Sequence, residues 1–129
     1  MTSKVIQTDK APAPVGPYNQ AILTSGQMLF VSGQIALDPS TGLIVGEGDV
    51  VKQTERVMAN IEAILQEAGA KFTNIVKTSV FLSDMNNFAV VNSVYAKYFD
   101  EPTAPARACV EVSRLPKDVL VEIDCIAVI

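Results

Sequence analysis

The chain of 129 residues contains no histidine and no tryptophan, and it has only two cysteines. The absence of histidine excludes the commonest general base, the Ser-His-Asp and Cys-His nucleophile systems, and the usual catalytic zinc sites. Cys109 and Cys125 are too few for a disulfide framework or a metal-ligand spacing, and we expect both to be buried free thiols. We therefore expect no metal site, and any chemistry must rest on Arg, Glu, Asp, Tyr, Ser and backbone groups.

The sequence also lacks dense runs of basic residues and long uninterrupted apolar runs. The net charge is −4 and no dense Lys/Arg run occurs, which argues against nucleic acid as a partner. Residues 1–4 lead into a strand-like stretch and not into the apolar core of a signal peptide. The apolar tail at 119–129 is interrupted by Glu122 and Asp124, so we expect no membrane span and a cytoplasmic location.

What the sequence does have is apolar surface, because hydrophobic residues make up 49% of it. One domain spanning residues 1–129 is expected from the length, and a chain of this size buries roughly two thirds of its unfolded surface. The composition leaves more hydrophobic surface than one small core readily hides. We expect self-association to cover it.

The N-terminal part of the chain predicts strands separated by a proline-rich loop. Residues 4–8 form an opening strand, and three prolines between residues 11 and 17 forbid a central strand or helix there. Residues 18–24 and 28–35 flank Ser25-Gly26-Gln27, whose glycine tolerates positive φ. This pattern predicts a β-hairpin.

The remainder predicts two helices and three strands. Apolar residues recur at three- and four-residue steps from 49 to 68, which marks an amphipathic helix that Gly69 ends. Residues 75–82 are rich in β-branched side chains, and the turn residues 83–86 start a second helix that runs through Phe99. Two final strands are expected at residues 106–112 and 119–128. The order predicts an α+β fold in which two helices cover one face of a mixed β-sheet and leave the other face for oligomerisation.

Arg107 is the first candidate site residue. Because strand side chains alternate, Arg107, Cys109 and Glu111 share one face, and we expect that Arg107 could meet Glu122 on an adjacent strand. The planar guanidinium could grip a carboxylate with two hydrogen bonds. It could equally form a structural ion pair with Glu111 or Glu122, and the local pattern alone slightly favours that ion pair. Glu122, between Val121 and Ile123, could hold or activate a water.

Other candidates carry weaker signals. Tyr18, Ser32 and Gly33 lie at expected strand ends and could line a pocket, although such residues usually serve packing or turns. Asn92 lies among apolar neighbours in the second helix, where a buried amide needs partners. Gly46-Glu47-Gly48 is interpreted as a turn and a helix cap and not as a phosphate loop, because Asp49 already places an anion at the helix N-terminus.

The segment at 105–116, PARACVEVSRLP, followed by Val121-Glu122-Ile123, closely resembles the RidA (YjgF, reactive intermediate deaminase) family. Gly16-Pro17-Tyr18, Val31-Ser32-Gly33-Gln34, and the segments at 75–78 and 88–92 also look like family segments. The resemblance thus covers nearly the whole chain. It implies a chorismate-mutase-like α+β fold and a homotrimer, whose sheets form a central barrel with three clefts between subunits.

The resemblance also implies an activity: hydrolysis of 2-imino acids and their enamine tautomers, such as 2-aminoacrylate and 2-iminobutanoate, to 2-oxo acids and ammonia. These intermediates are released by pyridoxal-phosphate serine and threonine dehydratases. Arg107 would bind the substrate carboxylate, and Glu122 would hold or activate water. The backbone of Cys109 would form a hydrogen bond with the substrate nitrogen or with water. The cleft would be lined by Tyr18, Ser32, Gly33, Phe88 and Asn92, some of them from the neighbouring subunit. No cofactor is implied, since an imine is already electrophilic and needs mainly positioning and proton transfer.

Three other functions stay open at this point. A regulatory trimer could bind a small carboxylate at Arg107 without turning it over. RNA cleavage or translation inhibition is ascribed to some relatives, but the acidic balance and the lack of a basic, aromatic-lined stripe disfavour it. Thiol-based or holdase behaviour has little support from two cysteines that we expect to be buried.

Overall fold

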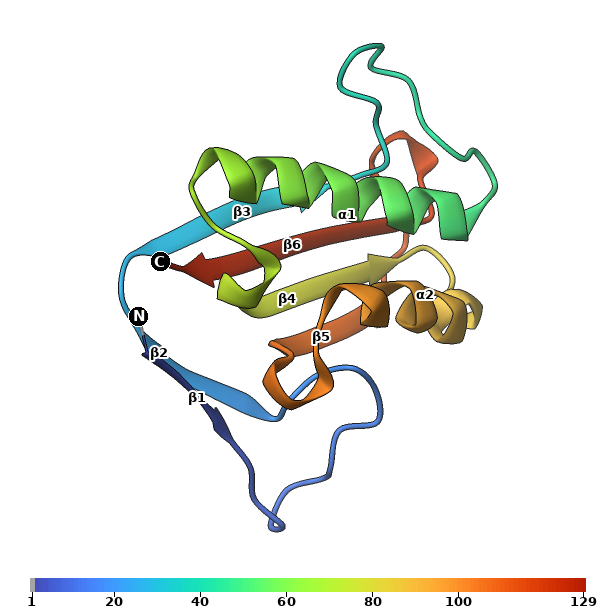
Figure 1. Ribbon diagram of the computed structural model, residues 1–129. Coiled ribbons are helices and arrows are strands. Elements are labelled where there is room, and N and C mark those ends of the chain that lie inside the picture. The colour runs from blue at the N-terminus through green and yellow to red at the C-terminus, as the bar shows by residue number, and fades with distance from the viewer. Residues whose placement is uncertain (1) are drawn as a thin grey trace.

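The computed structural model describes residues 2–129, which form a mixed four-stranded sheet, a separate two-stranded sheet and two helices (Figure 1). The larger sheet has the order β3-β6-β4-β5, in which β4 and β5 are parallel and the other pairs antiparallel. Its strands are β3 Met28–Gln34, β4 Ile75–Leu82, β5 Ala106–Glu111 and β6 Val121–Val128. Helices α1 Val50–Glu67 and α2 Phe88–Tyr95 lie on the same side of it (Figure 1). The predicted α+β sheet with two helices on one face is confirmed.

The predicted hairpin of the second and third strands is wrong. β2, Ala21–Ser25, pairs instead with β1, Thr2–Ile6, in the two-stranded sheet. The connecting Gly26 has φ +130°, and the next residue, Gln27, exchanges backbone hydrogen bonds of 3.0 and 2.9 Å with Ile129. These bonds begin the ladder between β3 and β6. The turn at 25–27 therefore passes the chain from one sheet to the other.

Helix α1 follows the predicted apolar periodicity and is closed at both ends. The Asp49 carboxylate accepts a hydrogen bond of 3.1 Å from the Lys52 backbone N–H, which confirms the cap expected at its N-terminus. Gly69 follows the last turn with φ +76°, a conformation that glycine adopts without a steric penalty. The buried face of α1 consists of Gln53, Thr54, Val57, Met58, Ile61 and Leu65. Burial of each large aliphatic side chain there contributes about 1.5–3 kcal/mol.

The predicted second helix is confirmed at its centre but consists of three pieces. A 3₁₀ turn, Met85–Asn87, precedes α2, and another, Ala96–Tyr98, follows it. The Asp84 carboxylate accepts a hydrogen bond from the Asn86 N–H and thereby caps the first turn. The backbone of Phe99 is extended, and the centroid of its ring lies 4.7 Å from the ring centroid of Tyr95. The helical run thus stops where the Phe99 side chain turns into the core.

The four-stranded sheet buries one face and leaves the other without a helix. Beneath the helices, β4 and β6 contribute Val80, Leu82, Ile123 and Cys125 to the core. On the opposite face Phe30 is 68% exposed and Val110 is 44% exposed. An open sheet face that carries large apolar side chains agrees with the excess of apolar surface expected from the composition. No helix within residues 2–129 is long and apolar enough to cross a membrane.

Candidate functional site

Arg107 lies on the helix-covered side of the sheet, at the edge strand β5. It is in register with Thr78 of β4, and its partly buried side chain reaches α2. Nη1 of Arg107 donates a hydrogen bond of 2.6 Å to Oδ1 of Asn92. Its Cζ lies 5.2, 5.8 and 5.1 Å from the ring centroids of Tyr18, Phe88 and Tyr95, respectively. The guanidinium is therefore held by one amide and three aromatic rings, within the range of cation–π attraction.

The structural ion pair that the local sequence pattern favoured is not formed in the described part of the chain. The Glu111 carboxylate instead accepts a hydrogen bond of 2.8 Å from the Met85 N–H. The ion pair within residues 2–129 joins Arg114 to Asp118 on the surface. The guanidinium of Arg107 is thus partly buried and has no carboxylate partner among residues 2–129. Such a group favours an anionic ligand, because a buried charge is stabilised by a partner.

Tyr95 is a wall of this site that sequence reasoning missed. It is fully buried, and its hydroxyl shares a hydrogen bond of 2.8 Å with the Thr78 hydroxyl. Burial raises the pKa of Tyr95 to about 12, although the Thr78 bond and the Arg107 charge oppose the shift. The ring therefore stays neutral at physiological pH. Its signal was available, since Phe88, Asn92 and Tyr95 fall at i, i+4 and i+7 on one helix face.

Cys109 lies on the same side of β5 as Arg107, opposite Val80 of β4. Burial raises the pKa of its thiol, and the charge of Arg107 only partly opposes this effect. The thiol therefore stays protonated, and a protonated thiol is a weak nucleophile. The raised pKa therefore argues against a reactive thiol at Cys109.

Glu122 occupies a different place from Arg107. It lies on β6 in register with Phe81 of β4, on the sheet face that the helices leave uncovered. The pairing of β3 with β6 is irregular between Val31 and Gln34, which places Ser32 and Gly33 in a bulge beside it. Any side chain on Gly33 would collide with the Glu122 carboxylate. The backbone of β3 is thus closely approached by this acid.

Arg107 and Glu122 do not meet within one chain, so the expectation that they could meet on adjacent strands is wrong. β4 lies between their strands. Their partners on β4, Thr78 and Phe81, are three residues apart, and strand residues separated by an odd number point to opposite faces. The predicted site residues therefore form two groups. Tyr18, Phe88, Asn92 and Cys109 surround or neighbour Arg107, whereas Ser32 and Gly33 accompany Glu122.

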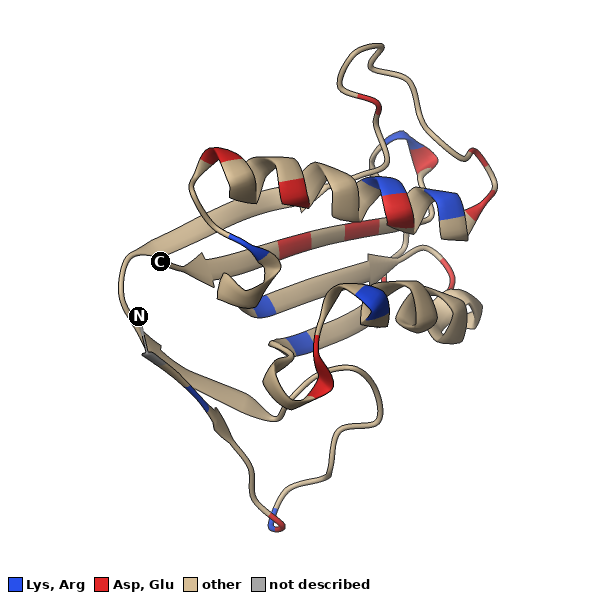
Figure 2. Ribbon diagram, viewed as in Figure 1, with Lys and Arg blue, Asp and Glu red and all other residues tan. Residues whose placement is uncertain are grey.

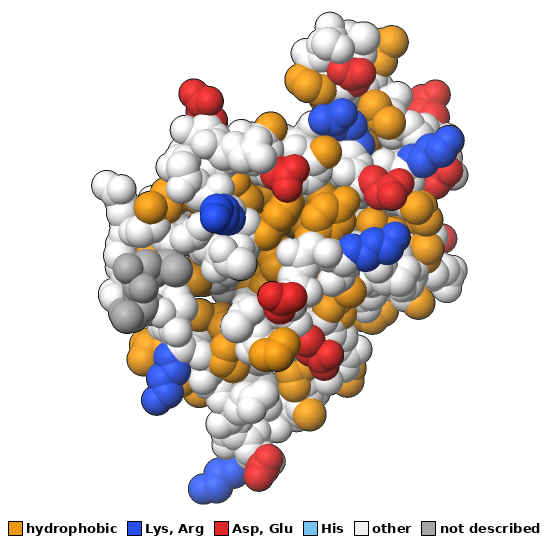
Figure 3. Space-filling view, in the orientation of Figure 1, with side chains coloured by type: hydrophobic (Ala, Val, Ile, Leu, Met, Phe, Trp, Pro, Cys, Tyr) orange, Lys and Arg blue, Asp and Glu red, His pale blue; other side chains and the backbone are white. Residues whose placement is uncertain are grey.

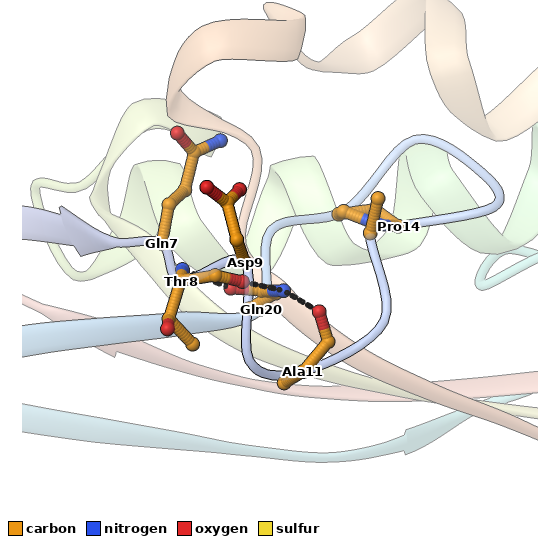
Figure 4. Close-up of a pocket in the computed structure, with 7 residues that line it drawn as sticks. Gln7, Thr8, Asp9, Ala11, Pro14 and Gln20 are labelled. Atoms are coloured by element: carbon orange, nitrogen blue, oxygen red, sulfur yellow. Dashed lines mark hydrogen bonds between the residues drawn. The ribbon is translucent and has the colours of Figure 1, made fainter.

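A pocket of about 510 Å³ lies elsewhere, inside the proline-rich loop (Figure 4). Its lining residues are Gln7, Thr8, Asp9, Ala11, Ala13, Pro14 and Gln20, none of which was a predicted site residue. At its centre the Gln20 amide donates to the carbonyl oxygens of Thr8, Ala11 and Pro12 and accepts from the Thr8 N–H. Gln20 thus fixes the loop that leads to Tyr18, and this pocket is spatially distinct from the Arg107 group.

Positive charge is dispersed over the molecule. Figure 2 shows Lys and Arg residues spread over separate elements, with acidic residues between them. On the face shown in Figure 3 the basic side chains stand apart from one another, separated by acidic, polar and hydrophobic ones. Nucleic-acid binding draws its affinity from clustered cations, and this face carries no such cluster.

Comparison with known proteins shows which family the chain resembles. The sequence matches the family described as Endoribonuclease L-PSP over residues 8–129. A RutC family protein of Synechocystis sp. is 66% identical over 129 residues, covering 100% of this chain and 98% of that protein. The 2-iminobutanoate/2-iminopropanoate deaminase of Salmonella typhimurium is 50% identical over 128 residues, with 98% of each chain covered. The crystal structure of E. coli TdcF with bound serine has a TM-score of 0.73 at 46% identity, again with 98% of each chain covered.

These matches extend over almost the whole sequence, so the matched region spans the positions of both groups of candidate site residues. They agree with the motif at 105–116 on which the family resemblance was first based. The chain therefore belongs to the Endoribonuclease L-PSP family, as a protein of the RidA/YjgF type.

Proposed function

We propose that this protein hydrolyses 2-imino acids and their enamine tautomers, of the 2-iminobutanoate and 2-aminoacrylate type, to 2-oxo acids and ammonia. The observation that carries the proposal is the partly buried guanidinium of Arg107, which has Asn92 and three aromatic rings around it. None of the carboxylates in the described part of the chain pairs with it. A planar carboxylate matches the remaining N–H groups of that guanidinium. Relatives about half identical to this chain carry the name of this activity.

The reaction needs positioning and proton transfer. With the substrate carboxylate on Arg107, water attacks the imine carbon, and one of its protons passes to Glu122. Glu122 passes this proton to the imine nitrogen, which gives a carbinolamine. The carbinolamine hydroxyl then gives up the second proton of the water, through Glu122, to the same nitrogen as the C–N bond breaks and the C=O bond forms. Ammonia is released and a 2-oxo acid remains. The enamine tautomer is first protonated at carbon. A single positioned proton-transfer group supplies about 10²–10⁴-fold, a suitable scale for an imine that already reacts with water.

The site of this proposal is shared between subunits of a homotrimer with a chorismate-mutase-like barrel of sheets. One chain supplies Arg107 with Tyr18, Phe88, Asn92 and the Cys109 backbone. Its neighbour supplies Glu122 with Ser32 and Gly33. Two observations support the arrangement: the two charged groups point to opposite faces of the sheet, and the face without helices carries exposed Phe30 and Val110. Apolar side chains on an open sheet face favour association.

The proposal is tested by adding the protein to a reaction of threonine dehydratase with threonine, and of serine dehydratase with serine. We expect the imine to disappear faster, with 2-oxo acid and ammonia appearing in equal amounts. Protein carrying Arg107→Lys is the matched control for non-specific effects of added protein. Equal rates of imine decay with wild-type protein, with the variant and with no protein would reject the deaminase function.

A second candidate is binding of a small carboxylate without turnover. The structure of E. coli TdcF with bound serine favours it, since a relative of this chain binds a small amino acid. Binding of this kind requires only the Arg107 group of one chain. Two measurements distinguish this candidate from the deaminase. Calorimetry would show binding of 2-oxobutanoate or serine, and the rate of imine decay would be unchanged by the protein. Cleavage of RNA, the activity in the family's description, gains no support from the dispersed cations (Figure 2).

A further inference from the structure

Two glycines in this chain lack the positive φ that favours glycine, and each faces one of the two proposed site charges. Five of the seven glycines have positive φ, which explains their occurrence without reference to any neighbour. These five are Gly26, Gly42, Gly46, Gly48 and Gly69. Gly16 and Gly33 are the other two, and neither has a φ in the left-handed region that favours glycine. Gly16 lies against Arg107 and Gly33 lies against Glu122.

The guanidinium of Arg107 occupies the space beside Gly16. A Cβ atom at residue 16 would lie 3.1 Å from Nη2 of Arg107 and 3.5 Å from Nδ2 of Asn92. It would also lie 3.5 Å from Cε2 of Tyr18. The contact with Nη2 is closer than the optimal separation of about 3.5–4.0 Å for non-bonded carbon atoms, so one of the two groups would have to move.

The loop that carries Gly16 is fastened at several points. The Tyr18 N–H donates to the Gly16 carbonyl at 2.8 Å, and the Val15 N–H donates to the Tyr18 hydroxyl at 3.2 Å. Asn19, which is buried, donates from Nδ2 to the Ala104 carbonyl at 2.7 Å. The Gln20 amide also holds the loop, through its bonds to the Thr8 and Ala11 carbonyl oxygens (Figure 4) and a further bond to the Pro12 carbonyl oxygen. Three prolines between residues 11 and 17 stiffen the backbone further.

We infer that Gly16 is a positioning residue of the Arg107 site. Its missing side chain lets the guanidinium lie between Asn92 and the aromatic rings, and it keeps Nη2 free for a ligand. A methyl group at residue 16 displaces the guanidinium by a few tenths of an ångström, since the fastened loop yields less than the end of an arginine side chain. Affinity for a carboxylate then falls although the fold is intact. Only this affinity effect rests on the proposed function.

The test compares Gly16→Ala and Gly16→Val with the wild type, and Val15→Ile is the matched control. Val15→Ile adds one methyl group to the same loop at a side chain that is 79% exposed. The first readout is the Nε–Hε NMR signal of Arg107 in ligand-free protein, identified by its loss in Arg107→Lys. The second is the dissociation constant for 2-oxobutanoate. The third is the melting temperature.

We expect both Gly16 variants to shift the Arg107 signal, with the larger shift in Gly16→Val. Gly16→Ala raises the dissociation constant about threefold to tenfold, since small misplacements of a positioning group are costly. Its melting temperature is unchanged or higher, because alanine restricts the unfolded chain more than glycine does. A purely structural role for Gly16 would lower stability and affinity together.

An unchanged Arg107 signal in Gly16→Ala would mean that the loop yields instead of the guanidinium, and it would overturn the inference. So would a signal shift of equal size in Val15→Ile. If wild-type protein binds no 2-oxobutanoate and hydrolyses no imine, the proposed function fails. In that case the Arg107 NMR signal still tests the role of Gly16, independently of the proposed function.

Discussion

Nη1 of Arg107 donates a 2.6 Å hydrogen bond to Oδ1 of Asn92, and this bond joins helix α2 to the edge strand β5. An amide oxygen accepts a hydrogen bond from the guanidinium but leaves its charge intact. A carboxylate at the same place would neutralise it. Asn92 was expected to line a substrate cleft, and its contact with Arg107 adds the role of orienting the arginine. The choice of amide over acid at this position therefore bears directly on function.

Asn92→Asp is expected to turn this orienting group into a competitor of the substrate. The new carboxylate pairs with Arg107 within the chain, so KM for the imino acid rises about tenfold to a hundredfold. Thermal stability is unchanged or improved, because an ion pair replaces a hydrogen bond from the charged guanidinium to a neutral amide oxygen. Steady-state kinetics and melting curves check this. Asn86→Asp, which adds the same charge at an exposed position nearby, serves as the control, and an equal rise in KM there would contradict the prediction.

Arg107→Lys keeps the charge but loses the planar fork, so we expect most imine hydrolysis to disappear while the fold persists. A loss of kcat/KM of about 10²-fold or more is expected from misplacement of the carboxylate. Coupled dehydratase assays measure the loss, and circular dichroism measures the melting temperature. Arg114→Lys is the control, since Arg114 forms an exposed ion pair with Asp118. Unfolding of the Arg107 variant would instead assign Arg107 a structural role.

Local pattern sufficed for most of the fold. The strand at 75–82 and the amphipathic helix with its Asp49 cap follow from residue spacing and capping chemistry. Strand pairing did not follow. Nothing between residues 18 and 35 indicates that β2 pairs with β1 and that β3 pairs with β6, because partners from distant parts of the chain decide the register. For the same reason, β4 was not expected between β5 and β6.

The site was predicted as a set of residues and not as an arrangement. Alternation along β5 correctly placed Arg107 and Cys109 on one face. Which face Glu122 occupies relative to Arg107 depends on strand order, which one sequence does not show. Gly16 illustrates a further limit. Its role follows from a distance to a side chain 91 positions away in the sequence, and no local pattern carries that information.

Tyr95 is expected to make stability fall in alkaline solution. Burial in the folded protein raises its pKa to about 12, above the value of 10.0 that an unperturbed tyrosine has in the unfolded chain. The unfolded chain therefore loses this proton first, and the stabilisation, complete below pH 10, is lost as the pH rises towards 12. The effect is about 2–3 kcal/mol over that window. Urea unfolding of the wild type and of Tyr95→Phe/Thr78→Val, which removes both hydroxyls, measures it. If the free energy of unfolding changed with pH in the same way for both proteins across this window, the assignment to Tyr95 would be contradicted.

Gly33→Ala is expected to disturb Glu122 without disturbing the Arg107 group. The new methyl group collides with the Glu122 carboxylate, and the ordinary φ of residue 33 imposes no backbone strain of its own. We expect kcat for imine hydrolysis to fall about tenfold or more, while 2-oxobutanoate still binds, because proton transfer by Glu122 is lost. Turnover and calorimetric binding separate the two effects. A fall in binding with unchanged kcat would be the opposite of this prediction.

Subunit mixing tests whether the two groups of residues act across an interface. Arg107→Lys and Glu122→Gln should each be nearly inactive alone, because every site in those oligomers lacks one charged group. In randomly mixed oligomers of the two, about a quarter of head-to-tail interfaces join an intact Arg107 to an intact Glu122. Co-expression with different tags should therefore recover roughly that fraction of wild-type activity. Arg107→Lys mixed with Asn92→Asp should show no such gain, since both changes damage the same group of one chain. No recovery in the first mixture would place both charges in one subunit's site and would contradict the shared cleft.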